Sequence, residues 1–81
     1  MQVNWRNYIH ADAAILGGKP VIKGTRISVE LLTERLANGW TPEDIRASYP
    51  QLPAEALAAV FAYLRENLAE SFQHLLPLKS A

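Results

Sequence analysis

The hydrophobic pattern of the chain changes at Ser28, and this change limits the folds that the chain can adopt. Before Ser28, short β-branched pieces are separated by glycine and proline residues, which are typical of turns and extended chain. From Ser28 onward, apolar residues recur with the period of about 3.6 residues that indicates amphipathic helices. We therefore predict one domain, with an extended or β arm over residues 1–27, three helices over residues 28–76, and a tail over residues 77–81.

Capping signals define the first two helices. Ser28 is a favourable N-cap for the first helix, and Gly39 stands where a glycine commonly ends one. Thr41 is the predicted N-cap of the second helix, because Pro42 follows it at the first helical position. We expect this second helix to end near Ser48.

The third helix is predicted to begin at Pro53 and to reach His74. Its apolar face and the first two helices predict a core of Leu32, Leu36, Ile45, Leu57, Phe61 and Leu64. About four turns suffice for such a core, so the remaining apolar residues need another surface. The candidate interface for a partner protein or a second copy consists of Leu68, Phe72, Leu75 and Leu76.

The arm carries two short β-branched pieces around a turn. We predict two small strands on either side of residues 23–25, with Gly24 as a turn residue of positive φ. Val21, Ile22 and Ile27 are expected to be buried. We expect packing against the helices, rather than the hydrogen bonds of the hairpin itself, to order this arm, because an isolated hairpin is marginal in water.

The arm also holds the only candidate nucleic-acid contacts. The net charge is zero, but the first 27 residues contain four cations and one carboxylate, a balance of +3, and the remainder a balance of −3. Lys19, Lys23 and Arg26 are therefore the candidate DNA-phosphate contacts, unless they are ordinary solvated charges. For Arg26, an internal ion pair with a helix carboxylate such as Glu30 is the alternative to a role as a phosphate or carboxylate clamp.

No residue pattern points to catalysis, and we expect neither an enzyme nor a metal or other cofactor. The chain has no cysteine, and His10 and His74 fall in different elements without nearby carboxylates. The glycine-rich stretch does not have P-loop spacing, because Lys23 precedes Gly24 and no helix follows directly.

Three short helices are also the plan of helix-turn-helix modules, but the third helix is poorly suited to base recognition. The side chains predicted to face outward from it are Glu55, Ala56, Ala58, Ala59, Ala62 and Arg65. Trp40 is predicted to fill the junction between the first two helices, and Tyr49 and Tyr63 to lie in the core with a polar tip.

The sequence resembles the domain-of-unknown-function family 433 over about residues 8–66. The matching segment of the arm comprises Gly17, Gly18, Pro20, Ile22, Gly24, Thr25, Arg26 and Ile27. Further matches are Gly39, Pro42, Glu43, Ile45, Tyr49, Pro50 and Leu52. The chain departs from the family pattern at the third helix, where Pro53 and Ala56 replace a Thr or Ser cap and an Asp.

The resemblance implies a helix-turn-helix-like (homeodomain-like) bundle grouped with VapB-type antitoxins. Such proteins are often encoded beside a small PIN-like ribonuclease that they would neutralise. We therefore predict a mainly α, cytoplasmic, antitoxin-like protein that binds such a toxin, with autoregulatory DNA binding and homodimer formation as additional properties. The alternative is a free-standing helix-turn-helix transcriptional regulator. No membrane association is expected, because no apolar run is long enough to span a bilayer.

Overall fold

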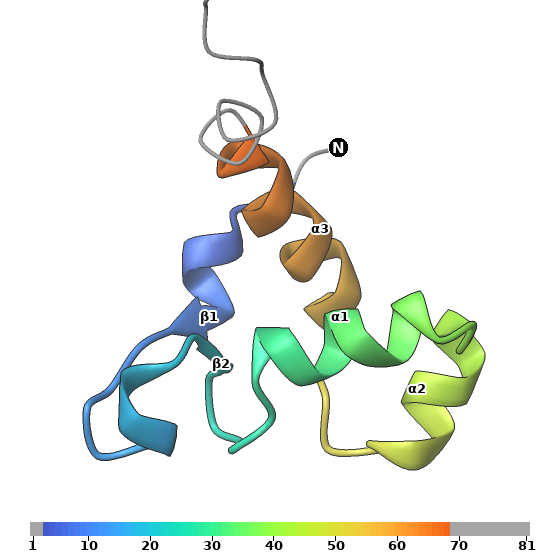
Figure 1. The fold of residues 1–81 in the computed structure, drawn as a ribbon, viewed down its shortest axis with the longest axis horizontal. Helices are drawn as coiled ribbons and strands as arrows, with labels where there is room; N and C mark the ends of the chain where they lie inside the picture. The colour runs from blue at the N-terminus through green and yellow to red at the C-terminus, as the bar shows by residue number, and fades with distance from the viewer. Residues whose placement is uncertain (1–2, 69–81) are drawn as a thin grey trace, which may run out of the picture.

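The computed structural model describes residues 3–68, which form three α-helices and a small two-stranded sheet (Figure 1). In chain order the elements are η1 (Trp5–Asn7), β1 (Ile9–His10), η2 (Leu16–Gly18), β2 (Val21–Ile22), α1 (Val29–Ala37), α2 (Pro42–Ser48) and α3 (Ala56–Glu66), where η denotes a 3-10 helix. The mainly helical class and the short N-terminal sheet are as predicted. The described chain therefore combines a β arm with a helical domain.

The strands pair differently from the prediction. β2 pairs antiparallel with β1, with Ile9 opposite Ile22. The segment after the turn contributes one isolated bridge, between Val21 and Ser28. Hydrogen bonds from the Ile22 N–H to the Ile27 carbonyl (2.9 Å) and from the Val29 N–H to the Pro20 carbonyl (3.0 Å) form this bridge. Because α1 begins directly after Ser28, the chain leaves β geometry there and cannot extend the pairing. Both hydrogen bonding and packing therefore order the arm.

The core lies where the sheet meets the three helices. The buried hydrophobic residues are Ile9, Val21, Ile22, Ile27, Val29, Leu32, Ile45, Ala56, Leu57, Ala59 and Val60. The predicted burial of the arm residues Val21, Ile22 and Ile27 is confirmed. Leu36, predicted in the core, is only partly buried and packs against its edge.

The orientation of α3 corrects the predicted core. Phe61 and Leu64 are 52% and 39% exposed, whereas Ala56 and Ala59, predicted to face outward, are buried. The helix packs through its small residues, because they let its backbone approach the rest of the core closely. Of the three α3 residues predicted in the core, only Leu57 is buried.

The ends of the helices follow local chemistry. Ser28 accepts a hydrogen bond from the Leu31 N–H, and Thr41 and Asp44 form a reciprocal capping box, as the sequence suggested. α3 begins three residues after Pro53, because residues 53–55 form a turn. α3 ends at Glu66 with Asn67 as its C-cap, and the Asn67 side chain donates to the Tyr63 carbonyl. The predicted end of this helix at His74 lies outside the described residues.

Candidate interaction surfaces

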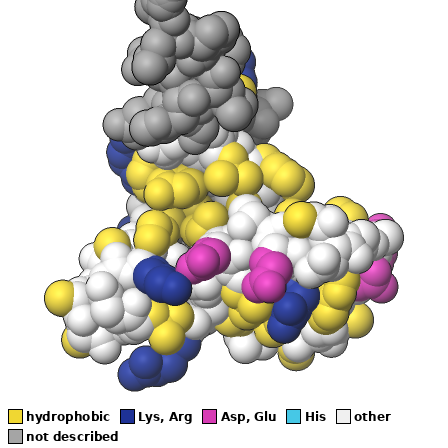
Figure 2. All heavy atoms as spheres, in the orientation of Figure 1, with side chains coloured by type: hydrophobic (Ala, Val, Ile, Leu, Met, Phe, Trp, Pro, Cys, Tyr) yellow, Lys and Arg dark blue, Asp and Glu magenta, His cyan; other side chains and the backbone are white. Residues whose placement is uncertain are grey.

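Three apolar side chains form an exposed strip along α3 and the residues just after it. Phe61, Leu64 and Leu68 are 52%, 39% and 60% exposed, and they are spaced three and four residues apart. Figure 2 shows hydrophobic side chains gathered over the part of the molecule that contains α3 and η1. We call these three residues the α3 stripe. Large apolar residues exposed together on one helix face are typical of an interaction surface.

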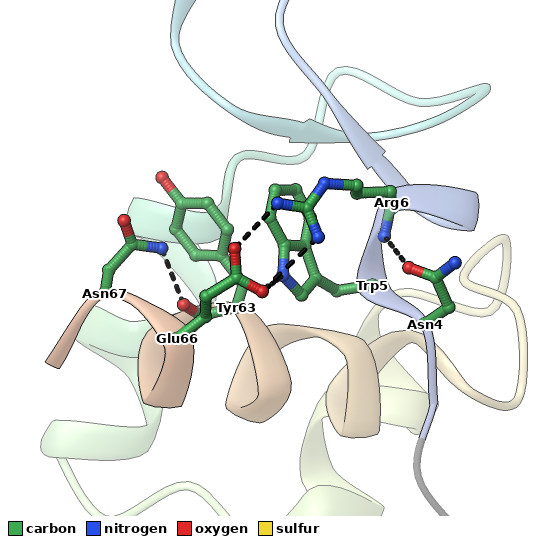
Figure 3. A network of polar contacts seen from close by, with 6 residues as sticks. All are labelled: Asn4, Trp5, Arg6, Tyr63, Glu66 and Asn67. Atoms are coloured by element: carbon green, nitrogen blue, oxygen red, sulfur yellow. Dashed lines mark hydrogen bonds and ion pairs between the residues drawn. The ribbon is translucent and has the colours of Figure 1, made fainter.

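A polar clamp fixes the α3 end that carries the stripe. The Glu66 carboxylate accepts hydrogen bonds from the Trp5 indole N–H (3.0 Å) and from both terminal nitrogens of Arg6, at 2.7 and 3.3 Å (Figure 3). The Trp5 ring also meets Tyr63 edge-on, with centroids 4.9 Å apart, and the Arg6 guanidinium lies 4.4 Å from the Trp5 ring centroid. Element η1 therefore anchors α3 on the side away from Phe61.

No role was predicted for Trp5 or Arg6. Their signal was an aromatic residue next to a cation, between two asparagines, and their partner Glu66 lies about sixty residues away in the chain. Hydrogen bonds from Arg6 and then Trp5 lower the pKa of the Glu66 carboxyl below its ordinary value. Glu66 is therefore a carboxylate with two fixed donors rather than a free acid.

The predicted interface falls only partly within the described residues. Leu68 is exposed and belongs to the α3 stripe. Phe72, Leu75 and Leu76 lie outside the described residues. Phe61 and Leu64, which the sequence analysis placed in the core, take part in the exposed surface instead.

The second candidate surface is the turn at residues 23–26, where Lys23 and Arg26 are exposed. Figure 2 shows Lys and Arg side chains at the lower edge of the molecule, where this turn lies in Figure 1. The third predicted DNA contact behaves differently, because the Lys19 ammonium donates to Glu30 at 2.8 Å. This contact raises the pKa of Lys19 and lowers that of Glu30. Glu30, the carboxylate proposed as the partner of Arg26, is therefore paired with Lys19 instead. Arg26 has no ion-pair partner among the described residues.

The junction of α1 and α2 is filled by aromatic side chains. Trp40 stacks on Tyr49 with centroids 6.4 Å apart, and the Arg35 guanidinium lies 5.2 Å from the Trp40 ring centroid. Both rings are partly buried against the core, as predicted for Trp40. A shallow depression of about 380 Å³ beside them is lined by Asn38, Gly39, Trp40, Asp44, Ala47 and Ser48.

The titratable groups in this part of the molecule have structural roles. The Asp44 carboxylate beside the depression accepts from the Thr41 N–H at 2.8 Å, which lowers its pKa. Within residues 3–68, no group of three or more His, Cys, Asp or Glu side chains is arranged to hold a metal ion. His10 is exposed, and His74 lies outside the described residues. None of the helices in the described part is long and apolar enough to cross a membrane.

Comparison with known proteins places the arm, the turn and most of the helical domain in one family. Residues 9–64 match the family described as protein of unknown function (DUF433). The chain belongs to the DUF433 family. A crystal structure of a DUF433 member protein from Anabaena variabilis superposes with a TM-score of 0.72 at 30% identity, covering 85% of this chain and 68% of that one.

A curated relative of this DUF433 chain is the uncharacterized protein y4eO of Sinorhizobium fredii. It is 32% identical over 62 residues, which are 76% of this chain and 28% of the relative. The DUF433 chain therefore spans less than a third of the length of this relative. The predicted family membership is confirmed, and the structural match shows that this chain shares the fold of another family member.

Proposed function

We propose that this DUF433 chain is an antitoxin-like protein that binds and neutralises a PIN-like ribonuclease in the cytoplasm, with the α3 stripe as its contact surface. The observation that carries the proposal is the exposure of Phe61, Leu64 and Leu68 on one helix face. The class of partner comes from the resemblance of the sequence to VapB-type antitoxins.

The geometry of the stripe suits a partner that offers an apolar groove. Side chains spaced three and four residues apart on a helix are the anchors of helix-in-groove recognition. Fully burying each such Leu or Phe contributes about 1.5–3 kcal/mol. Because these side chains are still partly exposed, part of that contribution is gained only when a partner covers them. The clamp at Glu66 holds the helix in place before a partner arrives, which lowers the entropy lost on binding.

A variant of the stripe tests the proposal. Phe61→Ser with Leu64→Ser removes two exposed anchors while leaving the buried core intact. We expect the double variant to bind the PIN-like product of the neighbouring gene at least about tenfold more weakly by calorimetry, and to inhibit its ribonuclease activity correspondingly less. The matched control is Leu16→Ser, which removes a 43% exposed leucine from η2. Equal weakening by both variants, or unchanged binding of the stripe variant, would refute the assignment of the surface.

Homodimer formation is the other use of the same stripe. Size-exclusion chromatography with light scattering distinguishes homodimer formation from toxin binding, because a dimer built on the stripe becomes monomeric in the Phe61→Ser and Leu64→Ser double variant. A wild-type monomer leaves the stripe available to a different protein.

The DNA-binding regulator has weaker support. Among the Arg, Lys, Asn and Gln side chains that read base edges, α3 offers only Arg65, in its last turn, and its exposed Phe61 and Leu64 are apolar. Of the three candidate phosphate contacts, Lys19 is already paired with Glu30. A gel shift with the upstream DNA at two salt concentrations tests this function, and a shift that disappears at the higher salt supports it.

A further inference from the structure

The turn at residues 23–26 presents two cations that the fold leaves unneutralised. Lys23 and Arg26 are both exposed, and neither forms an ion pair with a described residue. Arg6 and Lys19, the other cations of the arm, are both paired with carboxylates. After these two pairings, the charges left in the arm are the two cations of this turn and the carboxylate of Asp12.

The turn is held rigidly on both sides. The Thr25 hydroxyl donates to the Ile22 carbonyl at 2.8 Å and accepts from the Ile27 N–H at 3.0 Å. The Thr25 N–H also donates to the Ile22 carbonyl, and the Lys23 N–H donates to the Tyr8 carbonyl. Ile22 and Ile27 are buried at the two ends of the turn. Its backbone is therefore preorganised, so the turn loses little conformational entropy when a ligand binds.

The backbone of the turn is open to a ligand. Gly24 has a φ of +80°, and no atom lies within 4 Å of the position that a Cβ would occupy. The N–H groups of Gly24 and Arg26 donate to no acceptor among the described residues. Residues 23–26 therefore supply four unpaired donor groups, namely two backbone N–H groups, a planar guanidinium and an ammonium. Such a set matches carboxylate oxygens.

We propose that this turn binds carboxylate side chains of an acidic protein surface. The charge distribution favours a protein over a nucleic acid. Nucleic-acid-binding domains usually carry a clear basic excess, whereas this chain has a net charge of zero. A protein can place two or three carboxylates against the turn alone.

This site is separate from the proposed toxin-binding surface. In Figure 1 the turn lies at the lower edge of the molecule, whereas the end of α3 lies toward the top. A partner on the α3 stripe therefore leaves the turn available. The inference does not depend on the proposed function, because its test uses peptides and no nuclease.

The test is a titration of the full chain, labelled with ¹⁵N, with a hexaglutamate peptide at low ionic strength. We expect the amide resonances of Gly24 and Arg26 to shift and saturate, and a hexaglutamine peptide to leave them unchanged. Raising the ionic strength from about 0.01 to about 0.1 M shortens the Debye length from about 30 to about 10 Å and should weaken the binding.

Two double variants with the same change in net charge make the test specific. Lys23→Gln with Arg26→Gln should weaken hexaglutamate binding at least tenfold. Arg46→Gln with Arg65→Gln removes two exposed cations from the helices and should leave the binding within twofold of wild type. Equal weakening by both pairs, or no shift at Gly24 and Arg26, overturns the proposal. Tighter binding of a short DNA duplex than of hexaglutamate, with the same shifts, also overturns it and assigns the turn to nucleic acid.

Discussion

Arg6 and Glu66, sixty residues apart in the chain, form an ion pair in which both terminal guanidinium nitrogens contact the carboxylate. The shorter contact, from Nη2 to Oε2, is 2.7 Å. Trp5 donates to the same carboxylate, so one side chain of α3 contacts two of the three residues of η1. These contacts join the first helical turn of the described chain to the last turn of α3.

The pairing of Glu66 predicts a pH-dependent loss of stability. Its pKa is lower in the folded protein than in the unfolded chain, so its contribution is present above the ordinary pKa of a glutamate and is lost as the pH falls through the lowered value. We expect Glu66→Gln to lower the melting temperature at about pH 7, and the difference from wild type to shrink at about pH 3. Glu34→Gln, at an exposed and unpaired position of α1, is the control and should show no such trend.

The turn glycine predicts a backbone effect. Gly24→Val should destabilise the protein by at least ~1 kcal/mol, because a β-branched residue is strained at positive φ. No atom obstructs the added side chain, so the effect should come from the backbone alone. Gly24→Asn is the matched control and should have a smaller effect, since asparagine tolerates this region. Denaturant unfolding measures both, and a stability of the valine variant equal to wild type would contradict the turn geometry.

The small residues of α3 predict opposite results at neighbouring positions. Ala59 is fully buried, so Ala59→Leu should destabilise the fold by about 1–3 kcal/mol through overpacking. Ala58 is exposed, so Ala58→Leu should change the stability by no more than about 0.5 kcal/mol. Thermal unfolding of the two variants checks the orientation of the helix. Equal tolerance of both substitutions would support the face predicted from the sequence, in which Ala58 and Ala59 both face outward.

Truncation after Glu66 separates folding from binding. Among residues 3–68, all the buried hydrophobic side chains lie before this position, and the clamp with Arg6 is retained. We expect a folded domain with weakened self-association or toxin binding, because Leu68 and the later apolar residues are removed. Circular dichroism and light scattering measure the two properties. Unfolding of the truncated chain as a monomer would show that the removed residues belong to the intramolecular core.

Local chemistry in the sequence determined the family, the first two helices and the turn of the arm. Ser28 and Thr41 are N-caps because their side chains satisfy backbone N–H groups within three residues, and Gly24 takes positive φ because it has no Cβ. These effects act between near neighbours in the chain, so the sequence pattern alone is enough to predict them.

Tertiary structure decided which apolar residues of α3 are buried. Periodicity predicted the face with Phe61 and Leu64, whereas the folded chain buries the face with Ala56 and Ala59. That buried face packs in one cluster with residues of the arm and of the other two helices. Likewise, only the folded chain brings Lys19 to Glu30 and leaves Arg26 unpaired. A local sequence pattern does not encode these contacts, because each depends on the relative placement of separate elements.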